Sequence, residues 1–490
     1  MFLVNWLLVI IKIFVKIILM NKVPDHVFRG YDLRGVVGKD LDEENVLILA
    51  KGYATYLLQR RIYDCVIGFD SRESSPKFRD IFVKGLTGSG ITVYDIGITL
   101  SQICYFAQYY FRTRGMVMIT ASHNPKEYNG FKFGTGYSET MITEEIIEFR
   151  DLVKTGKFNS LEEKGKHIKF DVFLEYQKDL LRRIGKIKKF KVVVDSCAAT
   201  TGLFLPKILR SVGCEVIEQN TTPDPTFPVG VADPTEKEVQ ERLAKRVVQE
   251  KADLGFSYDT DGDRIGVVDQ DGGLIWNDTL VSLFSKDILD FAPGSKIIYN
   301  VLCSKQVDEV IEQNNGVPVM WKTGHSFIKA KVREERAIFG GELSGHFFFC
   351  DNFYGHDDGA IASLRLLAYL TRVDQSLKQA ISQLPHYFSS PEIKVGCPDN
   401  IKFSVVADKI GGEIKRLYPT AKYVEIDGVR MDTEKEMMIV RASQNGPYLT
   451  IKFEGKTQEK YDQLKNQVSK ILHNLPEIDF KSGVNVDSLK

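Results

Sequence analysis

The sequence predicts an α/β protein with three α/β units in tandem, followed by a smaller α+β unit. Three observations support this fold class. The length of 490 residues suggests roughly three or four domains. A hydrophobic fraction of 43% is normal for a globular protein and allows each domain a core of its own. Short β-rich runs alternate with longer helical runs, a rhythm typical of parallel strands joined by crossover helices.

The first unit shows this alternation from residue 45 onward. Strands are expected at residues 66–69, 92–96 and 116–119, and helices at residues 45–60, 76–86 and 144–154. A polar loop rich in turn formers is expected at residues 126–132. The polar stretch 155–166 is interpreted as a linker to the next unit.

The second and third units repeat the pattern, and the last one does not. The expected strands of the second unit are 191–195, 214–217, 252–258 and 264–269, with helices at 203–212 and 236–250 and a hairpin turn at 270–273. Those of the third unit are 296–302, 317–322 and 337–339, with helices at 304–313, 326–335 and 359–372. The last unit begins near Pro391 and has strands at 436–441 and 448–453 and a closing helix at 459–475. Its less regular alternation favours an α+β unit.

Charge and cysteine content narrow the function classes. Lys+Arg and Asp+Glu are equal at 65 each. The chain therefore lacks the excess of basic residues that would indicate a nucleic-acid partner. The seven cysteines are scattered without a C-x-x-C pair, which argues against a disulfide framework and against a zinc site. This cysteine usage fits a reducing compartment, and we expect a cytoplasmic protein.

Residues 1–19 form an apolar N-terminal extension broken only by Asn5, Lys12 and Lys16. A membrane span needs about 20 apolar residues and tolerates central lysines badly. The open alternatives are an interfacial amphipathic helix, a poor signal anchor, or translation upstream of the true start. We favour Met20 as the start, because a polar stretch follows it at once.

Residues 120–125, Thr-Ala-Ser-His-Asn-Pro, directly follow the expected strand 116–119. A strand that ends in such a loop places the Ser122 hydroxyl at a sheet edge, where ligands can reach it. Ser, Asn and Pro are also common turn residues, so a plain turn is the alternative.

Residues 259–264, Asp-Thr-Asp-Gly-Asp-Arg, bring three carboxylates close together. Such carboxylates repel one another unless a cation joins them, and hard oxygen ligands suit Mg²⁺ or Ca²⁺. An EF-hand is excluded, because its loop needs glycine at position six and glutamate at position twelve, where this chain has Arg264 and Gln270. A phosphate oxygen is a natural further ligand of Mg²⁺, and Ser122 is positioned to carry that phosphate.

These two stretches resemble the active-serine loop and the metal loop of the α-D-phosphohexomutase family. Three further stretches are similar to family motifs, in the family's order. They are an N-terminal signature at 28–35, Phe-Arg-Gly-Tyr-Asp-Leu-Arg-Gly; a sugar-binding loop at 341–346, Gly-Glu-Leu-Ser-Gly-His; and a phosphate-binding loop that starts at 441–443, Arg-Ala-Ser. The resemblance implies four domains around a central cleft, the first three with mixed sheets.

The resemblance also implies a reaction. Phosphate moves between O1 and O6 of a hexose through a phosphoserine and a bisphosphorylated sugar, with Mg²⁺ as cofactor and hexose 1,6-bisphosphate as activator. Ser122 would carry the phosphate and would bind Mg²⁺ together with Asp259, Asp261 and Asp263.

The resemblance implies roles for other residues as well. Arg34, Lys132 and His123 would balance phosphoryl charge as catalytic residues beside Ser122. The substrate-binding candidates are Tyr31, Arg264, Gly324, His325, Glu342, Ser344, His346, Arg441, Ser443, Gln444 and Asn445. Residues 70–75, Asp-Ser-Arg-Glu-Ser-Ser, are expected to support the serine loop.

The chain departs from the family pattern at two places. Leu302 stands where enzymes acting on mannose and glucose phosphates often have lysine. Residues 444–446, Gln-Asn-Gly, replace the usual residues of the phosphate-binding loop, although backbone donors stay available. We expect phosphate binding to survive and the choice of sugar to be blurred.

We therefore predict a phosphomannomutase/phosphoglucomutase acting on mannose and/or glucose phosphates. A phosphoglucosamine mutase is the alternative within the family. A non-catalytic, membrane-associated protein that binds sugar phosphates is the alternative from another class, and a phosphatase is a further one. The expected partners are small sugar phosphates, without nucleic acid, and a membrane only if residues 1–19 belong to the protein. The expected assembly is a monomer or weak oligomer.

The expected boundaries place the serine loop in residues 20–160 and the metal loop in residues 161–272. The sugar-binding loop lies in residues 273–388 and the phosphate-binding loop in residues 389–490.

Overall fold

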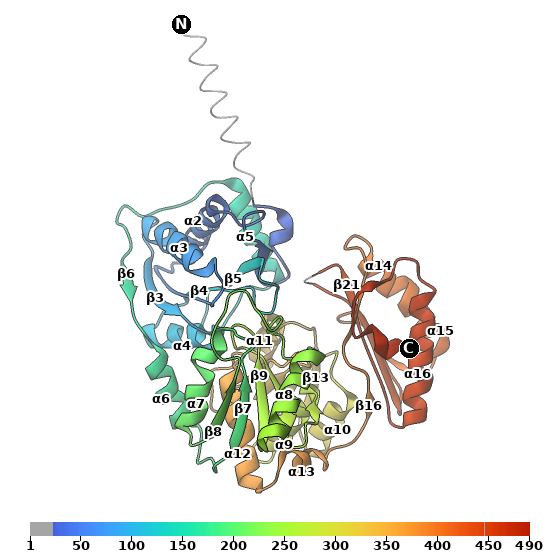
Figure 1. Ribbon diagram of the computed structural model, residues 1–490. Coiled ribbons are helices and arrows are strands. Elements are labelled where there is room, and N and C mark those ends of the chain that lie inside the picture. Colours follow the sequence, from blue (N-terminus) through green and yellow to red (C-terminus); the bar gives the residue numbers. More distant parts are fainter. Residues whose placement is uncertain (1–22, 445) are drawn as a thin grey trace, which may run out of the picture. The chain divides into compact units, whose positions relative to one another are not determined.

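A computed structural model describes residues 23–444 and 446–490 (Figure 1). The predictions for residues 1–19 and for Asn445 fall outside these residues. The chain forms two compact units. Within the described residues, the first comprises residues 23–246 together with Gly255–Ile265 and Asp358–Leu364. The second comprises Val247–Leu254, Gly266–Asp357 and the described part of Arg365–Lys490.

The N-terminal sheet is six-stranded and mixed, in the order β1-β5-β4-β2-β3-β6. Its strands are β1 (Leu33–Val36), β2 (Asp64–Phe69), β3 (Thr92–Ile98), β4 (Gly115–Ile119), β5 (Tyr128–Gly134) and β6 (His167–Lys169). Strands β2, β3, β4 and β6 pair in parallel, whereas β5 runs antiparallel to both β4 and β1.

Four helices cover this sheet: α2 (Glu43–Gln59), α3 (Ser75–Gly88), α4 (Ser101–Phe111) and α5 (Thr143–Thr155). Helices α2, α3 and α5 group on one face, and α4 lies on the other (Figure 1). Phe82, Phe131, Phe133 and Phe149 are buried in the core on the face of α2, α3 and α5. The strand β4, which carries the serine loop at its carboxyl end, is buried along its whole length.

The prediction of a loop at residues 126–132 is wrong for residues 128–132. Asn129 and Gly130 are turn formers, but they lie in β5 because that strand is bonded on both sides, to β4 and to β1. A Cβ at Gly130 would lie 2.1 Å from the carbonyl oxygen of Leu33. Glycine is therefore required there by the close approach of β1, rather than by a turn.

The second sheet is five-stranded, in the order β11-β10-β9-β7-β8. Its strands are β7 (Lys191–Asp195), β8 (Glu215–Gln219), β9 (Leu254–Tyr258), β10 (Ile265–Asp269) and β11 (Leu274–Ile275), and its helices include α6 (Phe173–Arg183), α7 (Leu205–Ser211) and α8 (Lys237–Glu250). Strands β10 and β11 pair antiparallel, which confirms the hairpin predicted at 270–273. The metal loop connects β9 to β10.

The third sheet is four-stranded, in the order β13-β12-β14-β15. Its strands are β12 (Lys296–Asn300), β13 (Val317–Trp321), β14 (Phe339–Gly341) and β15 (Phe347–Phe349). The accompanying helices are α9 (Asn277–Leu289), α10 (Lys305–Gln313), α11 (His325–Glu334), α12 (Gly359–Val373) and α13 (Leu377–Ile381). The predicted sugar-binding loop joins β14 to β15, an antiparallel pair.

The C-terminal sheet is seven-stranded, in the order β18-β19-β20-β21-β17-β22, with β16 paired to β21. Its strands are β16 (Phe388–Ser389), β17 (Ile393–Gly396), β18 (Lys422–Val424), β19 (Val429–Asp432), β20 (Glu436–Ala442), β21 (Tyr448–Gly455) and β22 (Asp479–Val484). Its helices are α14 (Lys402–Ser404), the π-helical η3 (Val405–Ile410), α15 (Gly411–Leu417) and α16 (Gln458–His473). All of its described strand pairs are antiparallel, as expected of an α+β unit.

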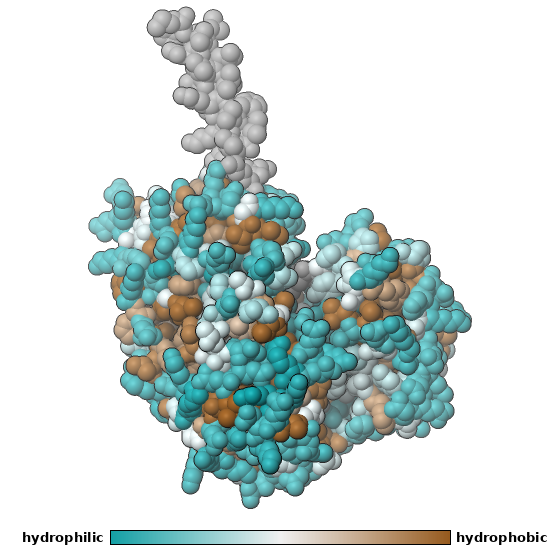
Figure 2. Space-filling model, in the orientation of Figure 1, coloured by the Kyte–Doolittle hydropathy of each residue, from teal (hydrophilic) through white to brown (hydrophobic). Residues whose placement is uncertain are grey.

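The surface in view mixes apolar residues with hydrophilic ones (Figure 2). Among residues 23–444 and 446–490, no helix combines the length and the hydropathy needed to cross a bilayer. The expected central cleft stays a prediction.

Candidate functional site

Ser122 lies in the loop between β4 and β5, in a strained backbone conformation. Its φ is +49°, in the left-handed region that costs a non-glycine residue about 1–2 kcal/mol. The backbone N–H of Ser122 donates to Thr120 Oγ1 at 2.8 Å. The Ser122 hydroxyl donates to Asp259 Oδ2 at 2.7 Å and lies 3.1 Å from His123 Nδ1. The strain therefore occurs where the hydroxyl meets the metal loop.

The side chain of Arg72 holds the backbone of this loop. Its guanidinium donates to three backbone carbonyls of the serine loop, those of Ser122 and Asn124 at 2.6 Å and Pro125 at 2.8 Å. It also donates to the carbonyl of Tyr128, the first residue of β5, at 3.0 Å. The Asp70 carboxylate in turn lies 3.2 Å from Arg72 Nε. The segment 70–75 thus supports the serine loop, as the sequence predicts.

The metal loop buries all three of its aspartates completely. Gly262 makes the bend between them with a φ of +75°. One carboxylate oxygen from each of Asp259, Asp261 and Asp263 lies within 4.8 Å of the others. The close spacing inferred from the sequence is therefore present in the fold.

Electrostatics in this loop favour a cation. Burial, reinforced by the charge of Asp263, raises the pKa of Asp259 to about 8. Burial acts in the same sense on Asp261, but the charge and hydrogen bond of Lys132 outweigh it and lower the pKa of Asp261. Asp259 is thus ionised only at a cost, which a bound cation would remove.

Lys132 and Ser101 contact the same carboxylates. Lys132 Nζ donates to Asp261 Oδ2 at 2.6 Å and to Asp263 Oδ2 at 2.5 Å. The Ser101 hydroxyl donates to Asp261 Oδ2 at 2.5 Å. Asp261 Oδ1 is buried with no hydrogen-bond partner among the described residues. A buried, unsatisfied carboxylate oxygen beside two further carboxylates fits a metal ion of the hard, oxygen-preferring class.

The backbone of the metal loop is held from two other segments of its unit. Gln102 Nε2, at the start of α4, donates to the Gly262 carbonyl at 2.9 Å. The N–H of Gly359, at the start of α12, donates to the same oxygen at 3.0 Å. Asp358 fixes this start of α12 by accepting from Ala360 N–H and from the Tyr176 hydroxyl.

Two arginines next to these loops fit an anion. Arg264 Nε donates to Asp259 Oδ2 at 3.1 Å and Nη1 to Asp233 Oδ1 at 3.2 Å, whereas its buried Nη2 has no partner within the described chain. Arg34 Nη1 donates to the Asn124 side chain, and Arg34 Nε donates to Asp32 at 2.9 Å. Burial acts to lower the pKa of Arg34, but the charge of Asp32 outweighs it and raises that pKa. Tyr31 is half-buried two residues before β1.

The sugar-binding loop lies in the second unit, where Glu342 is completely buried. Glu342 Oε1 accepts from Gly324 N–H at 2.7 Å, while Oε2 has no partner among the described residues. Burial raises the pKa of Glu342 to about 7. Asn300 Oδ1 accepts from Leu343 N–H at 3.1 Å, which orients the loop. An unsatisfied buried carboxylate oxygen is suited to a sugar hydroxyl.

His325 and His346 meet on one carboxylate. Their Nδ1 atoms lie 3.3 Å and 3.0 Å from Asp357 Oδ2, and their rings stack with centroids 5.3 Å apart. Lys329 Nζ donates to Asp357 Oδ1 at 3.1 Å. Burial acts to raise the pKa of Asp357, but the charge of Lys329 and then those of the histidines lower it. Ser344 is half-buried in the same loop.

The phosphate-binding loop joins β20 to β21. Arg441 is buried, and its Nε donates to Asp427 Oδ2 at 2.8 Å. Asp427 also accepts from Thr323 N–H at 2.9 Å, so that it links Arg441 to the segment before α11. Ser443 is buried and Gln444 is exposed.

The sequence does not single out Ser101 or Gln102, and it leaves the pair Asp357-Asp358 open between a role in supporting the site residues and a solvated one. Ser101 and Gln102 open a helix whose sequence shows no sign that it contacts a loop about 160 residues away. The buried Asp357 had one signal, its acidic neighbour Asp358 just before a predicted helix.

Comparisons with known proteins agree with this architecture. Three family models match: phosphoglucomutase/phosphomannomutase α/β/α domain I over residues 25–160, domain II over residues 172–273 and domain III over residues 276–388. The phosphomannomutase/phosphoglucomutase of Pseudomonas putida is 35% identical over 90% of this chain and 94% of its own length. The phosphoglucomutase of Neisseria meningitidis serogroup A is 31% identical over 94% of this chain and 99% of its own length.

A solved structure agrees as well. The crystal structure of a phosphoglucomutase/phosphomannomutase family protein from Burkholderia thailandensis superposes with a TM-score of 0.83, at 29% identity, and covers 92% of this chain and 98% of that one. The chain therefore belongs to the phosphoglucomutase/phosphomannomutase family, the α-D-phosphohexomutases, and is a hexose phosphate mutase.

Proposed function

We propose that this mutase interconverts the 1-phosphates and 6-phosphates of mannose and/or glucose, with Ser122 as the phosphate carrier. The hydrogen bond from Ser122 Oγ to Asp259 carries the proposal, because it places a strained serine hydroxyl in a buried, acidic, cation-seeking site. Two relatives, from Pseudomonas putida and Pseudomonas aeruginosa, bear both activities in their name. Leu302, which stands where a lysine often occurs in relatives, is buried and offers no polar group to a sugar. The preferred sugar is therefore tested by the assay below.

In the first step, phosphoserine 122 transfers its phosphoryl group to a free hydroxyl of the sugar monophosphate. A sugar O–P bond forms and the Ser122 Oγ–P bond breaks, while the proton of the sugar hydroxyl is given up and Ser122 Oγ takes up a proton. The product is a hexose 1,6-bisphosphate. In the second step, the other phosphate of that bisphosphate returns to Ser122 Oγ. The net reaction moves phosphate between O1 and O6 and regenerates the phosphoserine, so hexose 1,6-bisphosphate also serves to load the enzyme.

The residues beside Ser122 have separate proposed tasks. Asp259, Asp261 and Asp263 would hold Mg²⁺ together with the phosphoserine, and the ion would supply positive charge to neutralise the phosphoryl group. Arg264 directs its unpaired Nη2 to a phosphoryl oxygen. Arg34, His123 and Lys132 balance the charge that develops during transfer.

The loops of the second unit would recognise the rest of the substrate. Glu342 accepts hydrogen bonds from sugar hydroxyls, and the Ser344 hydroxyl exchanges hydrogen bonds with them. His325, His346 and Gly324 make further contacts. Arg441 and Ser443, with Gln444 and Asn445, hold the phosphate that does not react. A location in the cytoplasm stays a prediction.

A coupled assay tests the proposal. Mannose 1-phosphate, glucose 1-phosphate and glucosamine 1-phosphate are supplied separately, with Mg²⁺ and a trace of hexose 1,6-bisphosphate. We expect turnover of the mannose or glucose ester. Preference for the glucosamine ester would indicate a phosphoglucosamine mutase instead, and release of inorganic phosphate without isomerisation would indicate a phosphatase.

A further inference from the structure

Lys402, at the start of α14, is buried beneath the loop that joins β20 to β21. Its ammonium group donates to the Ser443 carbonyl at 2.6 Å and to the Gly446 carbonyl at 2.9 Å. It also donates to Asp399 Oδ1 at 2.7 Å. An ammonium has three N–H donors, so these contacts use all of them. The position of Lys402 is thereby fixed by both ends of the loop.

Other donors take the remaining carbonyls at this end of the hairpin. The Pro447 carbonyl accepts from Cys397 N–H, and the Tyr448 carbonyl accepts from Ser443 N–H. The Gly446 carbonyl accepts from Tyr448 N–H as well as from Lys402. Three carbonyls of the loop, those of Ser443, Gly446 and Pro447, therefore accept hydrogen bonds from outside the hairpin.

The direction of these carbonyls matters for an anion. A loop binds phosphate through N–H groups that converge on it, and a carbonyl oxygen turned to the same side would repel the ligand. Lys402 is the side chain that draws the carbonyls of Ser443 and Gly446 inward. It therefore favours a loop conformation in which these two carbonyl oxygens are turned toward Lys402 and away from a bound anion.

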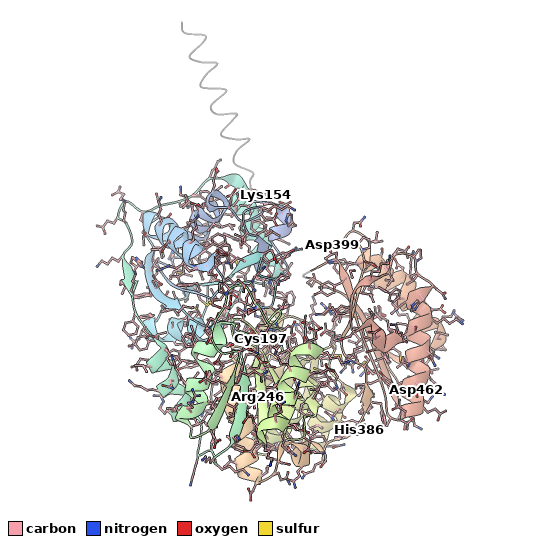
Figure 3. The ribbon with its side chains drawn as sticks, in the orientation of Figure 1. Lys154, Cys197, Arg246, His386, Asp399 and Asp462 are labelled. Carbon is pink, nitrogen blue, oxygen red and sulfur yellow. The ribbon has the colours of Figure 1, made fainter. Side chains whose placement is uncertain are left out.

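The charge of Lys402 acts in the same sense. Arg441, the buried cation at the start of the loop, is paired with the buried Asp427. The partner of Lys402 is different, since the Asp399 side chain is 57% exposed. Figure 3 shows where Asp399 lies on the C-terminal domain. Water screens an exposed carboxylate, so Asp399 cancels less of the field of a buried ammonium than a buried partner would.

We propose that Lys402 is a positioning residue for the phosphate-binding loop and supplies that phosphate site with a second cation. The proposal rests on the proposed role of Arg441 and Ser443 in phosphate binding. Lys402 touches the loop backbone and acts on the substrate through it, so that it affects binding of the non-reacting phosphate rather than the phosphoryl transfer itself.

The first test replaces Lys402 by an apolar side chain of similar length, Lys402→Met. Methionine removes the ammonium charge and both hydrogen bonds that hold the Ser443 and Gly446 carbonyls. We therefore expect KM for the sugar phosphate, and the inhibition constant of inorganic phosphate, to rise about tenfold or more while kcat changes little. The control is Lys409→Met, which removes a half-exposed lysine paired with Glu477 in the same domain and leaves both constants unchanged. A lower melting temperature with unaltered KM would overturn the proposal.

The second test keeps the proposal falsifiable if Lys402→Met fails to fold. Asp399→Asn removes the exposed counter-charge of Lys402 while the amide oxygen can still accept its hydrogen bond. We expect KM and the phosphate inhibition constant to fall about twofold to threefold, and an increase in either would contradict the role of Lys402. Arg441→Ala separates the two hypotheses. If Arg441→Ala raises KM but the Lys402 and Asp399 variants leave KM unchanged, the role proposed for Lys402 is wrong and that of Arg441 stands. If Arg441→Ala also has no effect, the proposed phosphate-binding loop fails first.

Discussion

The guanidinium of Arg72 donates a 2.6 Å hydrogen bond to the carbonyl oxygen of Ser122. The same group binds three further carbonyls, and Asp70 lies against its Nε. These contacts hold Ser122 in its left-handed conformation, because relaxation to an ordinary φ would swing its carbonyl away from Arg72. Arg72 therefore determines where the Ser122 hydroxyl points.

Replacement of Arg72 by lysine should reduce turnover more than substrate affinity. Lysine keeps the charge but lacks the planar fork that reaches four carbonyls. A nucleophile displaced by about 1 Å can cost on the order of 100-fold in rate. We expect kcat of Arg72→Lys to fall by about 10- to 100-fold with KM nearly unchanged in steady-state assays. Arg79→Lys is the matched control, because Arg79 lies on α3 and pairs with Asp95 of β3. This variant should retain kcat. A rise in KM at constant kcat would contradict this role.

Ser122→Ala should abolish mutase activity without unfolding the protein. Only the hydroxyl is lost, and alanine tolerates the remaining contacts, although its φ stays strained. Intact-protein mass spectrometry after incubation with glucose 1,6-bisphosphate should show one phosphate on the wild type and none on the variant. Activity retained by Ser122→Ala would remove Ser122 from its role.

Asp261→Asn should weaken metal binding. The substitution replaces an ionised ligand by a neutral one in a site whose charge attracts the cation. We expect the Mg²⁺ dissociation constant, measured by calorimetry, to rise about tenfold or more. Asp271→Asn removes an exposed carboxylate paired with Lys378 and should leave it unchanged. Equal affinity in wild type and Asp261→Asn would exclude Asp261 as a ligand.

Glu342 should make stability fall as pH rises. Burial raises its pKa from an ordinary value near 4.5 to about 7 in the folded state. Between these values the unfolded chain has released the proton that the folded chain keeps, so stability is full below about pH 4.5 and is lost as pH rises to about 7. The loss is about 3 kcal/mol as an upper figure.

Glu342→Gln should remove this part of the pH dependence. We propose urea unfolding of both proteins at about pH 5 and about pH 8, with the second unit followed by hydrogen exchange. The wild type should lose more stability between the two conditions than Glu342→Gln does. An identical loss in both proteins would show that Glu342 of the folded protein is already ionised at about pH 5.

Gly359→Ala should disturb the metal loop. A Cβ at Gly359 would lie 2.6 Å from the Gly262 carbonyl oxygen, so that the bend of the loop has to move. We expect weaker Mg²⁺ binding and a lower kcat. Gly412→Ala is the control, because nothing lies within 4 Å of its Cβ in α15. It should leave activity intact and stabilise the protein by up to about 1 kcal/mol. Unchanged Mg²⁺ affinity of Gly359→Ala would contradict the coupling.

The sequence alone predicted the regular elements best where hydrophobic runs are bounded by turn residues. The strand at 191–195 and the helix at 45–60, found at Glu43–Gln59, are examples. It failed at β5, where Tyr128, Asn129 and Gly130 resemble a turn because their partners, β1 and β4, are supplied by tertiary pairing.

The candidate site divides in the same way. Ser122 and the three aspartates could be found because the chemistry lies in contiguous motifs. Arg72 could be assigned a supporting role only by resemblance, and nothing local announces its four carbonyl contacts. Gln102 and Lys402 could not be found from the sequence. Each donates to a backbone carbonyl of a distant segment, and every residue type carries the same carbonyl group.

The hydrogen bond from Gly359 to the Gly262 carbonyl also has a temporal consequence. The first compact unit draws its last segment, Asp358–Leu364, from a point long after its other segments have been synthesised. A growing chain on the ribosome would hold a serine loop and an acidic loop well before the residues that fix the acidic loop have emerged. The reactive centre is thus completed late in translation, and a polypeptide truncated before residue 358 would carry the motifs of a phosphoryl carrier without the support that sets its metal loop.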